Sequence, residues 1–152
     1  MKMACHNHAV SSLKYPTTYL KVCQLVLLFA CLGLMRHYML SFGGNSISGY
    51  SFYDRDFLGK MTVGSMILIA LSNLLGILAG NSQFTLVHLL QYGVGSVLSA
   101  VSGSLVLQVY LGAWTQNESS SPGVALGVMN LTLSLLFSVD CFLMFRINQE
   151  AV

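Results

Sequence analysis

Charged residues are scarce in this chain of 152 residues. Only 8% of its positions are Asp, Glu, Lys or Arg, whereas soluble domains average about 25%. A water-soluble fold would therefore have to expose an implausibly large apolar surface. The formal net charge is +2, and no basic cluster accompanies it, so nothing in the charge pattern points to nucleic acid as a partner.

The chain also lacks the residue patterns that catalysis needs. It has no Cys-x-x-Cys pair, which argues against a four-helix thiol oxidase, and no His-rich cluster for a di-iron or haem site. Cys5, His6 and His8 lie together on one short amino-terminal arm, which is weak support for a metal ion. No Ser/His/Asp arrangement or phosphate-binding glycine loop can be assembled. We therefore expect no enzyme activity, no cofactor and no metal.

What the chain does have is four long apolar runs, at about residues 19–40, 58–80, 85–113 and 123–145. At ~1.5 Å per residue, each run is long enough to cross a hydrocarbon core of about 30 Å. Backbone polar groups inside a bilayer must bond within their own segment, so such runs form helices. We predict an all-α membrane protein, an antiparallel four-helix transmembrane bundle over residues 19–146. An arm (1–18) precedes the bundle and a tail (147–152) follows it.

Two features predict how this bundle is oriented. Four basic residues, Lys2, Lys14, Lys21 and Arg146, flank the two ends of the bundle sequence, against three elsewhere, Arg36, Arg55 and Lys60. This small bias favours both termini in the cytoplasm. Asn117 begins an Asn-Glu-Ser glycosylation acceptor in the third loop, which this arrangement places outside. The first run has no small-residue cleavage site and is expected to be retained. Residues 41–57 are expected to form the first outer loop.

Several polar residues interrupt the apolar runs. Counted from the span ends, five of them fall in the cytoplasmic half and are expected to form one hydrogen-bonded layer: Gln24, Asn73, His88, Gln91 and Asp140. Asp140 is the only acidic residue inside a span, and a carboxylate there costs roughly 2.5–3.5 kcal/mol unless it is paired or protonated. We favour a structural bond to His88 or Gln91. A loose pairing with Arg146 near the interface and a role in proton or cation coupling are the alternatives.

Small residues at a four-residue spacing predict close helix packing, either within one chain or between copies. They lie in the third and second runs: Gly95, Ser99, Gly103, Ser72 and Gly76. Cys23 and Cys141 lie near the cytoplasmic ends of spans, where S-palmitoylation occurs. We favour the simpler interpretation of both cysteines as small buried hydrophobic residues.

The end of the fourth run, Leu136–Arg146 (LFSVDCFLMFR), resembles the close of MARVEL-type four-helix proteins. The start of the first run, Leu20–Leu27 (LKVCQLVL), is similar to the entry of that family into its first helix. In the third run, Gly95–Leu98 and Ser102–Leu105 look like small insect members of the group. The layout of short inner loop and modest outer loops matches as well. Claudin-like proteins and tetraspanins fit worse, because their cysteine-bearing loops are missing here.

The resemblance implies a non-enzymatic protein that organises membranes, in vesicle trafficking, membrane apposition or cell junctions. Its expected partners are the lipid bilayer and either further copies of the chain or other membrane proteins. A PDZ-type scaffold reading the terminal Glu-Ala-Val at Val152 is a weaker expectation. The expected location is the plasma membrane or endomembrane vesicles. The alternative is a small transporter, or an accessory subunit of a channel or receptor, that uses the polar layer around Asp140.

Overall fold

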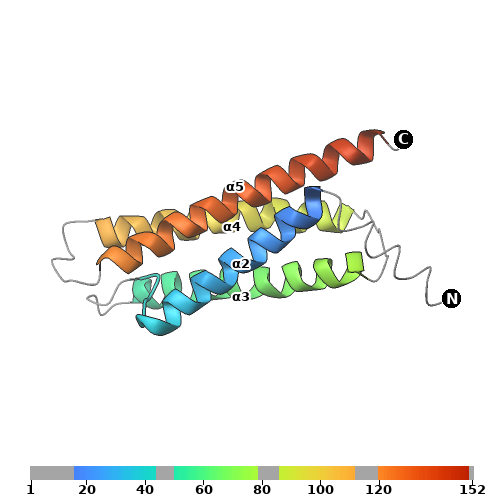
Figure 1. Ribbon diagram of the computed structural model, residues 1–152. Coiled ribbons are helices and arrows are strands. Elements are labelled where there is room, and N and C mark those ends of the chain that lie inside the picture. The colour runs from blue at the N-terminus through green and yellow to red at the C-terminus, as the bar shows by residue number, and fades with distance from the viewer. Residues whose placement is uncertain (1–15, 44–49, 79–85, 112–119, 151–152) are drawn as a thin grey trace.

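The computed structural model describes residues 16–43, 50–78, 86–111 and 120–150 of the chain (Figure 1). All regular structure in these ranges is helical: α2 (Pro16–His37), α3 (Tyr50–Leu78), α4 (Leu86–Leu111) and α5 (Ser120–Glu150). The helices run alternately up and down, and the start of α2 lies at the same end of the bundle as the end of α5. The predicted four-helix bundle is confirmed.

All four helices are long and apolar enough to cross a membrane, over Thr18–His37, Tyr53–Ile77, Val87–Leu111 and Ser121–Arg146. Large apolar side chains also cover the outside of the bundle, among them Leu68, Leu75, Leu90 and Leu135. A soluble bundle would confine such residues to an inward stripe, whereas lipid accepts them on every face. The chain is therefore an integral, multi-pass membrane protein.

The helices form a closed arrangement in which each packs on two neighbours: α2 on α3 and α5, and α4 on α3 and α5. The α4–α5 pair is by far the most extensive of these contacts. Apolar side chains from all four helices fill the interior, including Leu28, Met66, Val106 and Leu133. Of the described helices, the first (α2) and the last (α5) are thus direct neighbours, which decides where the polar residues meet.

Close backbone approach explains why α4 and α5 pack so extensively. A side chain at Gly103 would meet the carbonyl oxygen of Gly127, and one at Gly127 would meet the side chain of Leu107. One turn earlier on α5, the ring of Tyr110 lies against Gly123. Small residues at these positions allow the backbones to gain dispersion contacts, which drive helix association where no hydrophobic effect operates.

The five expected packing residues lie in two different environments. On α4, Gly103 faces Gly127, Ser99 is buried and Gly95 lies against the side chain of Met66. On α3, Ser72 is exposed, and a side chain added at Gly76 would meet nothing within 4 Å. Within the bundle, packing at the predicted spacing is therefore a property of α4, whereas Ser72 and Gly76 face away from the neighbouring helices.

The helix ends differ from the predicted span ends. The first helix stops at His37 rather than Leu40, because Met39 adopts a left-handed conformation (φ 52°) and the Leu40 N–H donates to the Met35 carbonyl (3.1 Å). This is the bond pattern of a Schellman helix end. The α5 helix continues to Glu150, past the predicted limit at Arg146.

The expected loop 41–57 is wrong in its second half, because α3 already begins at Tyr50. Hydropathy places Tyr50–Phe57 in a loop because the segment is polar, but Asp56 forms an ion pair with Lys60 one turn later, which supports a helix. The Phe42 N–H donates to Asp56 (3.0 Å), and the buried Phe42 ring lies on Gly59. The residues after α2 are thus folded against the start of α3.

Candidate functional site

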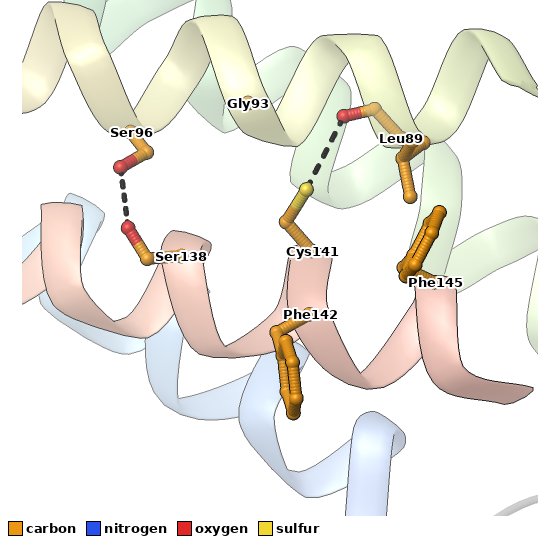
Figure 2. A pocket seen from close by; sticks show the side chains of 7 residues that line it. All are labelled: Leu89, Gly93, Ser96, Ser138, Cys141, Phe142 and Phe145. Atoms are coloured by element: carbon orange, nitrogen blue, oxygen red, sulfur yellow. Dashed lines mark hydrogen bonds between the residues drawn. The ribbon is translucent and has the colours of Figure 1, made fainter.

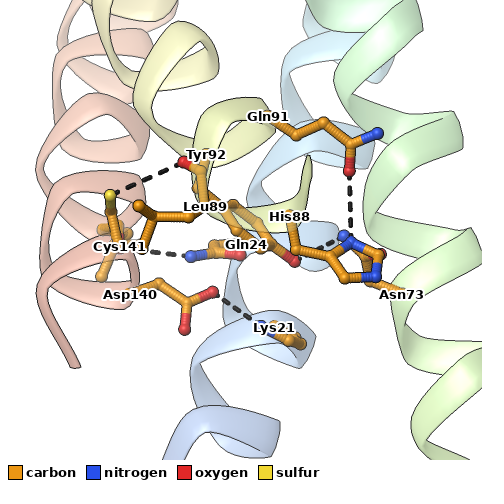
Figure 3. Close-up of polar contacts among 10 residues, drawn as sticks. Lys21, Gln24, Asn73, His88, Leu89, Gln91, Tyr92, Asp140 and Cys141 are labelled. Carbon is orange, nitrogen blue, oxygen red and sulfur yellow. Dashed lines mark hydrogen bonds and ion pairs between the residues drawn. The ribbon is translucent and has the colours of Figure 1, made fainter. Parts of the chain in front are cut away.

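A buried ion pair joins the first and last helices of the bundle. The Lys21 Nζ donates to Asp140 Oδ2 at 2.8 Å, and the side chains are only 4% and 0% exposed (Figure 3). The two residues are 119 positions apart in the chain. Each alone would be expensive in a low-dielectric interior, so the pairing is what makes either tolerable there. We call Lys21, Gln24, Asn73, Tyr92 and Asp140 the polar cluster.

Tyr92 connects the ion pair to the two other helices. The Lys21 Nζ lies 4.5 Å from the centre of the Tyr92 ring, within the range of a cation–π contact. The Tyr92 hydroxyl accepts a hydrogen bond from Asn73 Nδ2 at 2.8 Å. Because Asn73 belongs to α3 and Tyr92 to α4, the polar cluster draws one or two residues from every helix.

Gln24 completes the contact between α2 and α5. Its Nε2 donates to the carbonyl of Leu136 at 3.2 Å, one turn before Asp140. Gln24 and Asp140 are both fully buried, and each retains one oxygen, Oε1 and Oδ1 respectively, that has no hydrogen-bond partner among the described residues. Buried acceptors are satisfied in the great majority of cases, so two such oxygens in one cluster require an explanation.

The polar cluster differs from the predicted layer in its membership. Gln24, Asn73 and Asp140 lie in it, whereas His88 and Gln91 are half-buried and bond to each other on α4 (Nδ1 to Oε1, 3.3 Å). The expected bond from Asp140 to His88 or Gln91 is therefore replaced by the bond to Lys21. The reason lies in the packing: α5 contacts α2, so Asp140 meets the residue that α2 presents at that depth.

Sequence reasoning missed Lys21 and Tyr92. Lys21 served as a topology marker, and a tyrosine inside an apolar run is ordinarily a packing residue. One signal was available: Lys21, Gln24 and Leu28 follow a three- and four-residue spacing, which places them on one face of a helix. All three are in fact buried. Two polar residues sharing a face with a core leucine indicate a polar site inside the bundle.

A separate groove of about 420 Å³ lies between α4 and α5 and opens to the outside (Figure 2). Its lining residues are Leu89, Gly93, Ser96, Ser138, Cys141, Phe142 and Phe145. Its polar groups satisfy one another, because the Ser96 and Ser138 hydroxyls bond at 2.7 Å and the Cys141 thiol donates to the Leu89 carbonyl at 3.7 Å. The groove therefore presents an apolar surface to the bilayer.

The two candidate palmitoylation sites differ in access. Cys141 is half-buried in this groove, whereas Cys23 is exposed on α2, two positions after Lys21. In the part of the chain that the structure describes, no group of three or more His, Cys, Asp or Glu residues converges as metal ligands would. Asn117 and Val152, the expected glycosylation and scaffold sites, lie outside the described residues.

No protein-family model, curated protein or solved structure matches the chain. The geometry of the polar cluster and the surface of the bundle therefore carry the functional argument.

Proposed function

We propose that this chain is a non-enzymatic protein that organises membranes, in vesicle trafficking or at sites of membrane apposition such as cell junctions. The observation that carries the proposal is that the two buried charges bond to each other: the side chains of Lys21 and Asp140 are 4% and 0% exposed and form an ion pair. The charges inside the bundle thus hold its helices together. What the protein offers to its surroundings is the outer apolar surface.

The outward face of α3 supports a role in contacts with other membrane helices. Ser72 is exposed there, and side chains added at Gly64 or Gly76 would meet nothing within 4 Å. Small residues on a lipid-facing surface allow close approach of a second helix. Further copies of this chain or other membrane proteins are the partners that such a face suits.

The proposed orientation has both termini in the cytoplasm, and the proposed location is the plasma membrane or endomembrane vesicles. The sequence supports this orientation by a bias of four basic residues on the proposed cytoplasmic side to three on the other, Arg36, Arg55 and Lys60. The resemblance of Leu136–Arg146 to MARVEL-type proteins supports the same orientation and the same class of function.

The alternative function is a small transporter, or an accessory subunit of a channel or receptor. One observation favours it: Asp140 Oδ1 and Gln24 Oε1 are buried acceptors without a partner among the described residues. A transport site would use such oxygens to bind a proton or an ion during passage. The ion pair beside these oxygens favours the organising function instead, because Lys21 and Asp140 already neutralise each other.

A flux measurement on Asp140→Asn separates these two functions. The full chain is reconstituted into proteoliposomes, and proton and monovalent-cation flux is compared with that of protein-free vesicles. Asp54→Asn, at an exposed position outside the polar cluster, is the matched control. We expect no flux above background for the native chain or either variant. Flux that Asp140→Asn abolishes, while helix content and the control remain unchanged, would overturn the organising function.

A second experiment tests the organising function directly. Proximity labelling by the tagged full chain in its native cell is expected to mark integral proteins of vesicle or junctional membranes. The variant Gly76→Ile, on the outward face of α3, is expected to lose part of this labelled set. The matched variant Gly33→Ile, on the outward face of α2, is expected to retain it. Identical labelling by both variants would show that the face of α3 has no part in partner contacts.

A further inference from the structure

We propose that the polar cluster is a binding site for a water molecule inside the membrane-spanning bundle. It lies where the side chains of Lys21, Gln24 and Asp140 meet (Figure 3). This inference concerns the ligand of the cluster and does not depend on the cellular function proposed above.

The cluster lacks hydrogen-bond donors rather than acceptors. Asp140 Oδ1 and Gln24 Oε1 are both fully buried and receive no hydrogen bond from any described residue. The other groups of the two side chains are occupied, Asp140 Oδ2 by Lys21 and Gln24 Nε2 by the Leu136 carbonyl. A ligand of this site must therefore bring N–H or O–H donors.

The two oxygens belong to one small region of the bundle. Lys21 and Gln24 are three positions apart on α2, so their side chains leave the same face of the helix. Gln24 reaches the carbonyl of Leu136, which is one helical turn from Asp140 on α5. All the polar groups of the site thus lie within about one turn of each helix.

Charge decides which donor fits. Lys21 and Asp140 already neutralise each other, so a bound cation would leave one uncompensated positive charge in the interior, at high cost. An anion would face two acceptor oxygens. A neutral molecule with two donors meets neither objection, and water is the smallest of these.

Lys21 supplies the remaining contact that a buried water needs. An ammonium group has three N–H donors, and the described contacts of Nζ are with Asp140 and with the Tyr92 ring. Its remaining N–H has no partner among the described residues and can donate to the water oxygen. One donor and two acceptors make three polar partners, which is the typical number for a buried water.

The position of the site allows water to reach it. Lys21 follows the first residue of α2, Pro16, by five positions, which corresponds to about 7.5 Å along the helix axis. The site therefore lies much nearer to the end of the bundle where α2 begins than to the opposite end.

Water-edited solid-state NMR on the isotope-labelled full chain in lipid bilayers tests the proposal. Magnetisation from water protons is expected to reach the Asp140 carboxyl carbon much faster than the methyl groups of Leu133, which is fully buried among apolar residues. Equal build-up rates at Asp140 and Leu133 would overturn the proposal, and this comparison uses the native chain alone.

The variant Gln24→Leu tests the part played by the glutamine. With one of three partners removed, transfer to Asp140 is expected to fall by about half, while the Lys21–Asp140 cross-peak remains. Gln108→Leu makes the same change at an exposed position of α4 and is expected to leave the transfer unaltered. If magnetisation transfer from water to Asp140 were undiminished in Gln24→Leu while the ion pair remained intact, Gln24 would not bind the water and the proposed site would be wrong.

Discussion

The ion pair between α2 and α5 makes a sharp prediction about three variants: Lys21→Met, Asp140→Leu and the double substitution. Removing one partner of a buried pair costs about 3–5 kcal/mol, because the other charge stays buried and uncompensated. Replacing both partners by apolar residues of similar size is often neutral or stabilising. We therefore expect each single variant to be less stable than the double variant.

The structure also predicts that the two single variants differ. In Lys21→Met, Asp140 loses the one hydrogen bond that its carboxylate receives from the described residues, and it lies fully buried on α5. We therefore expect the full loss of about 4 kcal/mol. In Asp140→Leu, Lys21 keeps the Tyr92 ring, a contact worth about 1–2 kcal/mol, and its flexible chain can extend toward the nearby end of α2. We expect this variant to lose only about 2 kcal/mol, less than a fully uncompensated charge would cost.

The assay is reversible unfolding of the full chain in mixed micelles, in which rising SDS content is followed by far-ultraviolet circular dichroism. The double variant is expected within about 1 kcal/mol of the native chain, which gives a coupling energy of several kcal/mol between the two sites. Additive effects, with the double variant the least stable of the three, would refute the pairing. Equal losses in the two single variants would refute the compensating role of Tyr92.

Three further predictions use the same unfolding assay. Gly103→Val forces a side chain against the Gly127 carbonyl and is expected to cost about 2–3 kcal/mol. Gly33→Val, where nothing lies within 4 Å, is the control, and an equal effect in both would contradict the close α4–α5 contact. Met39→Gly removes the strain of a left-handed conformation at the end of α2 and is expected to raise the free energy of unfolding by about 1 kcal/mol. A decrease in the free energy of unfolding would contradict that conformation. Tyr92→Phe leaves the buried Asn73 amide without its acceptor, and we expect a loss of about 1–3 kcal/mol; an unchanged midpoint would show that the bond contributes nothing.

The number and kind of the helices were predictable because a bilayer imposes the same requirement on every spanning segment. Any apolar run of sufficient length must satisfy its own backbone, so hydropathy alone identifies α2, α3, α4 and α5. The helix ends were less predictable. Hydropathy reports which residues tolerate lipid, whereas a helix continues as long as its hydrogen bonds do, as Tyr50–Phe57 of α3 illustrates.

The sequence predicts how deep in the membrane the polar residues lie, but not which of them bond to each other. Counting from the span ends places Gln24, Asn73 and Asp140 at a similar level, and the structure has all three there. The partner of Asp140 depends on which helices are neighbours and on how each is rotated about its axis. Four apolar runs of similar character carry little information on either point. His88 lies at the predicted depth too, but it faces Gln91.

The rotation of each helix about its own axis, which the sequence does not reveal, also explains why only some of the predicted small residues pack inside the bundle. Gly95, Ser99 and Gly103 on α4 and Ser72 and Gly76 on α3 share one spacing, yet only the first set packs within the bundle. The missing information was the partner surface: Gly123 and Gly127 on α5, also four residues apart, lie against Tyr110, Gly103 and Leu107 of α4. A small-residue spacing predicts that a helix can be approached closely, and a matching spacing on a second helix is needed to predict by what.

The way the four helices contact one another indicates what the polar cluster does for the structure. The α4–α5 pair is held by backbone proximity, and these helices are consecutive in the chain, so their association is local. The contact of α2 with α5 is the long-range closure of the bundle, and a less extensive interface supports it. Lys21–Asp140 and Gln24–Leu136 lie in that interface. Directional polar bonds thus add to an interface in which apolar packing alone selects one register poorly, because lipid competes equally well for any apolar face. A charge pair has one satisfactory geometry, so it specifies which turn of the first helix meets which turn of the last.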